Sequence, residues 1–263
     1  MPLILRKCQK NGLSSNNFYY GNVGDIVTCP DWNPEPKCGN GLHGLLEGNG
    51  DWGLLYGDDW LVIEANESDI VKIDECKCKF HTGKILFRGS KEQLANSEFP
   101  AKFENLNSKS AFNWGRDIGN HDVMMHKITE SEWAYFWAKY IGNHDIMMHK
   151  ITDPYWAYYW GRDIGNHDIM MHKITDPLWA YYWAKNIGNH DVIMHKITNS
   201  KYAYWWAKNI GNHDVMINKI NEPHSAYFWA KCIGNHDVMK PKVTDHYYIE
   251  RWNETFPNNP INT

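Results

Sequence analysis

The C-terminal half of the chain repeats one pattern of apolar and polar positions with a period of 23 residues. A Gly-Asn-His-Asp motif marks each copy, and it begins at Gly119, Gly142, Gly165, Gly188, Gly211 and Gly234. In the copy that covers 153–175, Trp156, Trp160 and Ile164 recur every four residues, which places them on one face of a helix. A second apolar set follows the motif. The pattern therefore predicts two short helices in every repeat.

Residues typical of helix ends bound these predicted helices. Asp153 and Pro154 suit the N-cap and the first position of the longer helix, because proline has no N–H to leave unpaired there. Gly165 predicts its end, and Asn166 is expected to cap the shorter helix that follows. Helices of about 11 and about 8 residues are too short to be stable alone in water. We therefore expect them to stack as an α-helical solenoid, in which each repeat packs on its neighbours.

The segments around the repeats give the predicted domain organisation. Residues 105–110 are polar and predict a linker, and 111–243 hold the six repeats. The pattern of the last repeat breaks at Pro241. Residues 244–263 are predicted to form a capping helix and a tail, with Trp252 in the position of the repeat tryptophans.

Residues 1–104 follow a different pattern, with short apolar runs between turns rich in glycine and asparagine. A short helix is expected at 91–96. Four runs predict β-strands, at 60–64, 70–73, 76–80 and 84–87. The predicted fold class is therefore α+β, with a small mainly-β N-terminal domain followed by an α-helical solenoid of 23-residue, two-helix repeats.

The composition narrows the classes of partner. The 263 residues include 14 Trp and 15 Tyr, and these side chains suit both cores and binding faces. The formal net charge is −4 and no run of basic residues occurs, which argues against nucleic acid as the partner. No apolar stretch approaches the length of about 20 residues that crosses a bilayer, so no membrane role is expected.

The cysteines and the N-terminal sequence bear on the cellular compartment. The first residues lack the apolar core and the small-residue cleavage site of a secretory signal peptide. Five of the six cysteines lie before residue 80, at irregular spacings. Small secreted domains usually carry a regular disulfide framework, so we expect an intracellular, reducing location.

Histidines occupy two positions of the repeat. The first follows the Gly-Asn pair in every copy, and the second comes five residues later in four copies, His149 and His172 among them. One hypothesis is that these histidines form a ladder that binds metal or senses pH. Five residues turn a helix by about 140°, so the two histidines of one copy cannot ligate the same ion. We favour the alternative that the first histidine makes a repeated hydrogen bond between neighbouring repeats, and no metal site is predicted.

The aromatic positions of the repeat fall into two groups. One tryptophan and one alanine are the same in every copy, which indicates packing of a large side chain against a small one. The predicted repeat core therefore contains Trp137, Trp160, Trp183, Trp206 and Trp229. The position that holds Tyr159, Tyr182 and Trp205 is mostly aromatic but variable, and if it is exposed it can hold a partner. The position of Tyr155 changes freely between copies and is expected to face solvent. Tyr155, Tyr159, Tyr182 and Trp205 are therefore the candidate binding residues of the repeats.

A zinc site is one hypothesis for the N-terminal cysteines, and it involves Cys29, Cys38, Cys76 and Cys78. The spacing is unsuitable, because a C-x-C pair on a strand points its two thiols to opposite faces. No second CxxC pair exists either. Structural thiols are the favoured interpretation.

The glycine-rich stretch 39–44 contains the one candidate for a catalytic residue, His43. This histidine is either a base or a ligand contact, or it is a turn residue in a glycine-rich loop, which is the interpretation that we favour. No Ser-His-Asp set, HExxH motif or pair of carboxylates accompanies it, so no catalytic residue is assigned and no cofactor is predicted. Trp52 and Trp60 are the neighbouring candidates for contact with a small ligand.

Four short stretches of the N-terminal domain carry a resemblance to a known family. They are Cys38-Gly-Asn-Gly-Leu-His-Gly44, Trp60-Leu-Val-Ile-Glu64, Lys77-Cys-Lys-Phe80 and Gly83-Lys-Ile-Leu-Phe-Arg-Gly89. Together they resemble an uncharacterised N-terminal domain of phage and giant-virus proteins, in which varied repeats often follow. That domain has no assigned activity, so no catalytic residue is carried over. The repeats are similar in design, though not in sequence, to short-helix repeat families of amoebal bacteria and giant viruses, and the resemblance implies a viral origin.

These observations together predict a non-enzymatic interaction or assembly protein. The solenoid is expected to bind a protein partner or further copies of the chain, in the host cytoplasm or in a virion. The first alternative is an enzyme or small-ligand-binding protein centred on His43. The second is metal binding along the repeat histidines.

Overall fold

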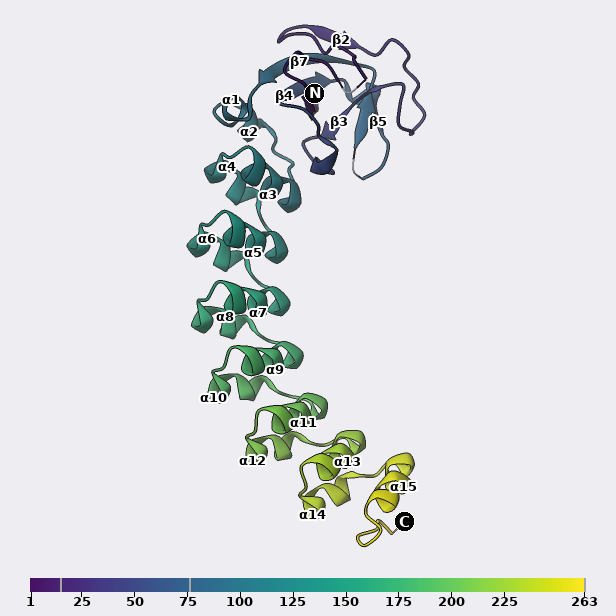
Figure 1. Cartoon of the computed structure of the whole chain (residues 1–263), viewed down its shortest axis with the longest axis vertical. Coiled ribbons are helices and arrows are strands. Elements are labelled where there is room, and N and C mark those ends of the chain that lie inside the picture. The colour runs from purple at the N-terminus through teal and green to yellow at the C-terminus, as the bar shows by residue number, and fades with distance from the viewer. Residues whose placement is uncertain (15, 76, 263) are drawn as a thin grey trace. The chain divides into compact units, whose positions relative to one another are not determined.

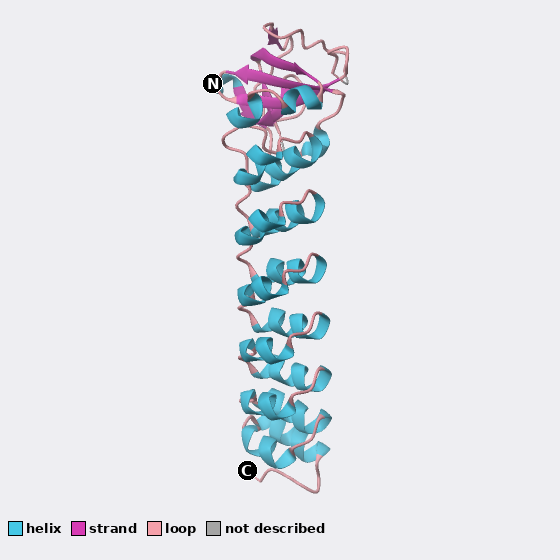
Figure 2. Cartoon of the chain, turned by 90° about the vertical axis from the view of Figure 1, so that its left-hand side faces the viewer, coloured by secondary structure: helices cyan, strands magenta, loops and turns pink. Residues whose placement is uncertain are grey.

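A computed structural model describes residues 1–14, 16–75 and 77–262. The chain divides into two compact units, Met1–Lys150 and Ile151–Thr263. The first unit holds a β-sheet domain and two repeats, and the second holds four repeats and a further helix. The strands belong to the N-terminal part and paired helices follow it (Figures 1 and 2), which confirms the predicted α+β class with helical repeats.

The strands among the described residues form one antiparallel sheet in the order β2-β7-β4-β1-β3-β6-β5. They are β1 (Leu3–Cys8), β2 (Ile26–Thr28), β3 (Leu42–Leu46), β4 (Asp59–Ala65), β5 (Ile70–Lys72), β6 (Cys78–Phe80) and β7 (Thr82–Gly89). The last four agree with the predicted runs, although Cys76 lies outside the described residues. The sequence pattern does not predict the first three, because a strand buried on both faces, such as β1, shows no alternation of apolar and polar residues.

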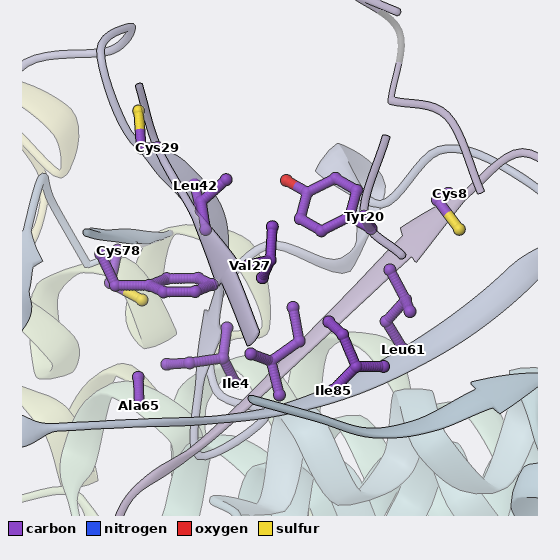
Figure 3. Packing of buried hydrophobic residues seen from close by; sticks show 12 residues of the cluster. Ile4, Cys8, Tyr20, Val27, Cys29, Leu42, Leu61, Ala65, Cys78 and Ile85 are labelled. Carbon is purple, nitrogen blue, oxygen red and sulfur yellow. The ribbon is translucent and has the colours of Figure 1, made fainter. Parts of the chain in front are cut away.

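One face of the sheet carries the hydrophobic core of this domain. Ile4 of β1, Ile63 of β4 and Ile85 of β7 lie opposite one another in register and are fully buried. Figure 3 shows Ile4 and Ile85 packed in one cluster with Tyr20 and Val27. Each such aliphatic side chain contributes roughly 1.5–3 kcal/mol by its removal from water. This cluster fixes the register of the central strands.

The opposite face of the sheet packs against helical residues. The ring centroid of Trp60 lies 5.6 Å from that of Trp52, and Trp52 lies 6.0 Å from Trp114 of the first repeat. The short helices α1 (Lys91–Ala95) and α2 (Phe99–Lys102) follow the sheet, and α1 contacts β4 and β7. The first repeat therefore shares a core with the sheet domain.

The predicted linker, residues 105–110, is held at this junction. The side chain of Asn49 donates to the carbonyl oxygen of Asn105 at 2.8 Å and accepts from the backbone N–H of Asn107 at 2.9 Å. Asn107 then caps α3 (Ser108–Asp117) through its own side chain. Polar residues that suggest a free linker thus form a fixed turn and a helix cap.

Each repeat contains one helix of ten residues and a shorter second helix. The first helices are α3, α5 (Ser131–Tyr140), α7 (Pro154–Asp163), α9 (Pro177–Asn186), α11 (Ser200–Asn209) and α13 (Pro223–Cys232). The second helices are α4 (His121–Lys127), α6 (His144–Lys150), α8 (His167–Lys173), α10 (His190–Ile193), α12 (His213–Met216) and α14 (His236–Met239). The last three continue as 3-10 turns. After the repeats, α15 (His246–Thr255) buries Trp252 completely, as a capping helix should.

A glycine and an asparagine form the turn between the two helices of each repeat. Gly165 has a φ of 113° and Asn166 a φ of 54°, both in the left-handed region that these residue types tolerate best. Asn166 occupies the N-cap position of α8, as predicted, but its side chain makes no capping hydrogen bond there. The predicted cap of α7 is confirmed, because Asp153 accepts from the N–H of Tyr155 at 2.8 Å.

The repeated tryptophan is fully buried in every copy. In the second unit these residues are Trp160, Trp183, Trp206 and Trp229, and in the first they are Trp114 and Trp137. The alanine three residues before each tryptophan is buried as completely. Packing is so close that a Cβ added to Gly161 would lie 2.4 Å from Cη2 of Trp183 in the next repeat. The pairing of a large with a small residue leaves no free space between these repeats.

The first histidine of each repeat binds the end of the helix before it. Nε2 of His167 lies 2.9 Å from the carbonyl oxygen of Gly161, and the same contact recurs in all six copies at 2.8–3.1 Å. This carbonyl belongs to the last turn of α7, where no helical N–H follows, and because a carbonyl oxygen can only accept, the imidazole donates through Nε2. The expected hydrogen bond joins two helices of one repeat, and the prediction that it joins neighbours is wrong. The neighbouring repeat contacts the ring instead, with Trp183 edge-on at 5.9 Å between centroids.

The lysine at the end of each second helix connects successive repeats. Nζ of Lys196 donates to the carbonyl oxygens of Met171, His172 and Ile174 at 2.7, 3.2 and 2.6 Å. Equivalent bonds to the preceding repeat occur at Lys150, Lys173, Lys219 and Lys242. The ammonium group lies at the C-terminal end of the preceding helix, where the helix dipole is negative and backbone carbonyl oxygens can accept further hydrogen bonds. These lysines therefore hold each repeat in register with the one before it.

Replacing Lys196 by Met should destabilise the second unit. Methionine keeps the aliphatic stem but withdraws the ammonium from three carbonyl oxygens. Hydrogen bonds from a charged donor contribute about 1.5–3 kcal/mol and do not add fully, so we expect a loss of about 2–3 kcal/mol in the free energy of unfolding. Denaturant unfolding followed by tryptophan fluorescence measures this loss.

Lys185→Met is the matched control, because Lys185 is exposed and its ammonium contacts no carbonyl group in the described part of the chain. This variant should change the free energy of unfolding by less than about 0.5 kcal/mol. Equal losses in the two variants would contradict the role given to Lys196.

Candidate functional site

The first helices of the second unit carry a row of aromatic side chains on one side. We call this row the aromatic face, and it consists of Tyr155, Trp156, Tyr159, Trp179, Tyr182, Tyr202 and Trp205. Each of these residues is half-buried. The four predicted binding residues, Tyr155, Tyr159, Tyr182 and Trp205, all belong to it. The face is therefore neither core nor fully exposed surface.

Ring contacts join the aromatic face across repeats. The ring of Tyr155 in α7 meets that of Trp179 in α9 edge-on, with centroids 4.8 Å apart. Tyr181 of α9 lies 5.8 Å from Trp205 of α11 and 6.5 Å from Tyr202. Tilted and edge-on pairs are the favourable geometries for aromatic rings. Because each ring is held by its neighbours, a partner that binds here immobilises few additional side chains.

A row of cations runs beside the aromatic face. In α7 the guanidinium of Arg162 lies 4.4 Å from the ring centroid of Tyr159, but Asp163 pairs with it at 2.6 Å. The later repeats have Asn186, Asn209 and Cys232 in place of that aspartate. The exposed lysines of these repeats, Lys185, Lys208 and Lys231, make no salt bridge within the described residues. Each of α9, α11 and α13 therefore carries one lysine here in place of the Arg162–Asp163 ion pair of α7.

The aromatic and basic rows meet in a groove between α9 and α11. Its walls include Tyr182, Trp205, Lys185 and Lys208, and its volume is about 290 Å³. The amide of Asn209 donates to the hydroxyl of Tyr181 at 3.0 Å and fixes the floor. Of the residues that the structure describes, none that lines this groove is acidic. Such a groove can hold an apolar or aromatic group together with a carboxylate.

The sequence pattern does not predict two of these four groove residues. Tyr182 and Trp205 are predicted, whereas Lys185 and Lys208 are not. The signal that could have found them is the loss of the aspartate after the basic residue in the later repeats, because it leaves the lysines without a counter-ion.

The second set of repeat histidines is exposed. His149 and His172 lie at the C-terminal ends of α6 and α8. Within the described ranges no group of three or more His, Cys, Asp or Glu side chains is arranged to hold a metal ion. The first set is committed through Nε2 to backbone carbonyl groups.

His43 lies on a strand, and the favoured interpretation of a turn histidine is wrong. It belongs to β3 and pairs in register with Lys79 of β6. Gly41 before the strand and Gly44 within it conceal the strand in the sequence, because glycine is depleted in strands, and its pairing partners are seen only in the sheet. His43 lines a cavity of about 170 Å³ together with Arg6, Lys7 and Lys77.

The environment of His43 disfavours its positive form. Burial, together with the positive charges of Arg6, Lys77 and Lys79, lowers the pKa of this imidazole from 6.5 to about 4. Its Nε2 atom is buried and has no hydrogen-bond partner among the described residues. A neutral imidazole of such low basicity is a poor general base at pH 7, and no acidic residue lines the cavity to assist it.

The other N-terminal candidates lie in the core. Trp52 and Trp60 are 7% and 3% exposed and pack against each other, so the structure corrects their expected contact with a ligand. Aromatic side chains of this size are used here to join the sheet to the first repeat. Among the cysteines, Cys8, Cys29 and Cys78 are free and buried, Cys38 is free and exposed, and Cys76 lies outside the described residues.

Comparison with known proteins gives no relative from which a function can be transferred. No family model, no curated protein and no solved structure matches the chain. None of the helices that the structure describes is both long and apolar enough to traverse a lipid bilayer.

The imidazole of His43 should titrate with a midpoint near pH 4, well below its ordinary value of 6.5. Between these two values the unfolded chain binds a proton that the folded chain does not, so the free energy of unfolding falls as the pH drops through this window. NMR of the imidazole signals measures the midpoint.

His43→Gln removes this contribution, while the other histidines remain common to both proteins. The loss of stability between pH 7.5 and pH 4.5 should therefore be smaller in the variant. A midpoint near 6.5, or identical pH profiles for the two proteins, would contradict the structure of this site.

Proposed function

We propose that the chain is a non-enzymatic interaction scaffold whose aromatic face binds an extended acidic segment of a protein partner. One observation carries the proposal. In the second unit, half-exposed aromatic rings and lysines without counter-ions follow one another with the period of the repeat. The scaffold itself is built from side chains that are buried or bonded to the backbone.

The chemistry of the face favours a protein segment. Tyrosine, tryptophan and cationic side chains are the residue types enriched at the energetic centres of protein interfaces. The rings offer large, rigid contact areas to apolar side chains, and the neighbouring ammonium groups attract carboxylates. A segment that alternates apolar and acidic residues matches both rows.

The repetition adds affinity. Equivalent positions recur in α7, α9, α11 and α13, so an extended segment can contact several repeats at once. After the first contact, each further contact is intramolecular and adds affinity without a new encounter. The resemblance to phage and giant-virus proteins supports a place for this scaffold in a virion or an infected cell.

Self-association is the second candidate, and one observation favours it. Exposed aspartates at the start of the second helices recur with the same 23-residue period as the lysines. They are Asp168, Asp191, Asp214 and Asp237. A second copy could therefore match an acidic row to the basic row over several repeats.

The groove between α9 and α11 should bind an acidic, amphipathic peptide. The probe is a labelled 20-residue peptide in which Glu alternates with Leu, and fluorescence anisotropy measures its affinity for the full chain. The double variant Tyr182→Ala with Trp205→Ala should weaken binding at least about tenfold, because central aromatic anchors contribute 2 kcal/mol or more. The double variant Lys185→Gln with Lys208→Gln should weaken it and reduce its dependence on salt.

Val192→Ser with Val215→Ser is the control, since these side chains are 50% and 37% exposed on the second helices, away from the aromatic face. This control variant should bind the peptide with the same affinity as the unmodified protein. Failure to bind the peptide would overturn the proposal, as would tighter binding of oligothymidylate, which stacks on aromatic rings beside cations. Self-association is tested by sedimentation velocity at increasing protein concentration. If the chain associates and the aromatic double variant does not, self-assembly replaces peptide binding as the proposed function.

A further inference from the structure

The groove between α9 and α11 differs in charge from the start of the aromatic face. Lys185 and Lys208 both line it, and among the residues that the structure describes none in its wall is acidic. In α7 the equivalent cation, Arg162, is paired with Asp163 at 2.6 Å. The groove therefore holds two ammonium groups, whereas α7 presents an ion pair without net charge.

The two lysines lie beside one set of rings. They hold equivalent positions in α9 and α11, which are successive copies packed against each other, so both project to the same side. Nζ of Lys185 lies 5.9 Å from the ring centroid of Tyr181, and Nζ of Lys208 lies 5.7 Å from that of Tyr204. The ring of Tyr181 lies 5.8 Å from that of Trp205 between centroids.

The acidic residue at the other end of α9 does not balance these charges. Asp176 caps that helix and accepts from the N–H of Leu178 at 2.8 Å. Lys185 follows it by nine residues, which is about 13 Å along a helix. Exposed charges separated by more than about 10 Å are largely screened at physiological salt. The carboxylate that neutralises the lysines must therefore come from another molecule, or another anion must take its place.

The walls and the floor of the groove favour an aromatic group. Tyr182 and Trp205 are half-buried and present ring surface to the groove, whose volume is about 290 Å³. The hydroxyl of Tyr181 accepts from the amide of Asn209 at 3.0 Å, and its own hydrogen has no acceptor among the described residues. The groove thus offers stacking surface, two ammonium groups and a hydroxyl donor.

The number of charges distinguishes between the anions that could bind. A carboxylate brings one negative charge, whereas a phosphate monoester carries about −1.5 to −2 at pH 7 and three acceptor oxygens. Two lysines without a carboxylate match the phosphate better. We propose that this groove is the anchor site for a phosphorylated tyrosine of the partner segment, with its ring against Tyr182 and Trp205 and its phosphate between Lys185 and Lys208.

This inference rests on the proposed function, because it names the residue of the partner segment that the aromatic face anchors. It adds a regulatory consequence. A kinase that phosphorylates the partner would strengthen the complex, and a phosphatase would weaken it.

Three forms of one peptide test the inference on the full chain. The peptide is the alternating Glu–Leu sequence with a tyrosine in place of a central leucine, and the tyrosine is unmodified, sulfated or phosphorylated. Phosphorylation should raise the affinity in fluorescence anisotropy at least about tenfold, because it adds charge-assisted contacts to two ammonium groups. The sulfated form has the same shape but one negative charge, so its affinity should lie between the other two.

Two variants should remove the preference for the phosphorylated form. In Lys185→Gln with Lys208→Gln, the ratio of the two affinities should fall below about twofold, because no ammonium group remains in the groove. Asn209→Asp should also lower the ratio, since it places a carboxylate beside Lys208 as Asp163 lies beside Arg162. The hydroxyl of Tyr181 can donate to that carboxylate. Near-ultraviolet circular dichroism checks that both variants keep the native packing.

Lys231→Gln is the matched control, because it removes the same charge one repeat further on, from a lysine that does not line the groove. It should leave the ratio of the two affinities unchanged. An equal fall of the ratio in this control would indicate attraction by the overall charge and would contradict the inference.

The source of the phosphate is tested separately. Free phenyl phosphate should bind much more weakly than the phosphorylated peptide, because it lacks the contacts of the neighbouring residues. Equal affinity for the two, or tighter binding of oligothymidylate, would exclude a phosphotyrosine partner.

The inference and the proposed function can fail separately. If the unmodified and phosphorylated peptides bind equally well, or the sulfated form binds as tightly as the phosphorylated form, only the inference fails. If none of the three forms binds, the proposed function fails with it.

Discussion

The repeats depend on one constraint, which is that short helices cannot satisfy their own ends. A helix of seven to ten residues leaves four carbonyl groups at its C-terminus without a helical partner, and these are a large fraction of its backbone. In this chain one histidine per repeat donates to the end of the first helix, and one lysine donates to the end of the second helix of the repeat before it. Both residues therefore recur at the same position of successive repeats. Nε2 of the histidine and Nζ of the lysine are occupied by these hydrogen bonds and are not available for catalysis or ligand binding.

Because these residues satisfy the helix ends, the residue types on one side of the first helices can vary between repeats. The tryptophan and alanine of each repeat fill the contact between neighbours, and the Gly-Asn pair fixes the turn. Residues on the aromatic face contribute less to packing, so their identity changes from copy to copy. The replacement of Asp163 by Asn186 and Asn209 in later repeats then changes the charge of that face without disturbing the core.

The sheet domain uses its own side chains in two ways. Trp52 and Trp60 bind it to the first repeat, so that α3 belongs to the same compact unit as the strands. On β1, by contrast, Arg6 contacts Tyr20 of the core cluster, and Lys7 lies over the ring of Trp60 on the opposite face.

The sequence by itself determined the features that repeat or that act locally. The 23-residue period, the two short helices, the cap at Asp153 and the buried Trp160 follow from spacing and residue type, because helix periodicity and capping act within a few residues. The strands 59–65 to 82–89 are recognisable for the same reason. Only the tertiary structure decided the pairing of β1 and β3, the position of His43 on a strand, and the carbonyl partners of Lys196. These contacts join residues 22 to 42 positions apart, and no local pattern specifies which chain segment a buried strand or a long cationic side chain will meet.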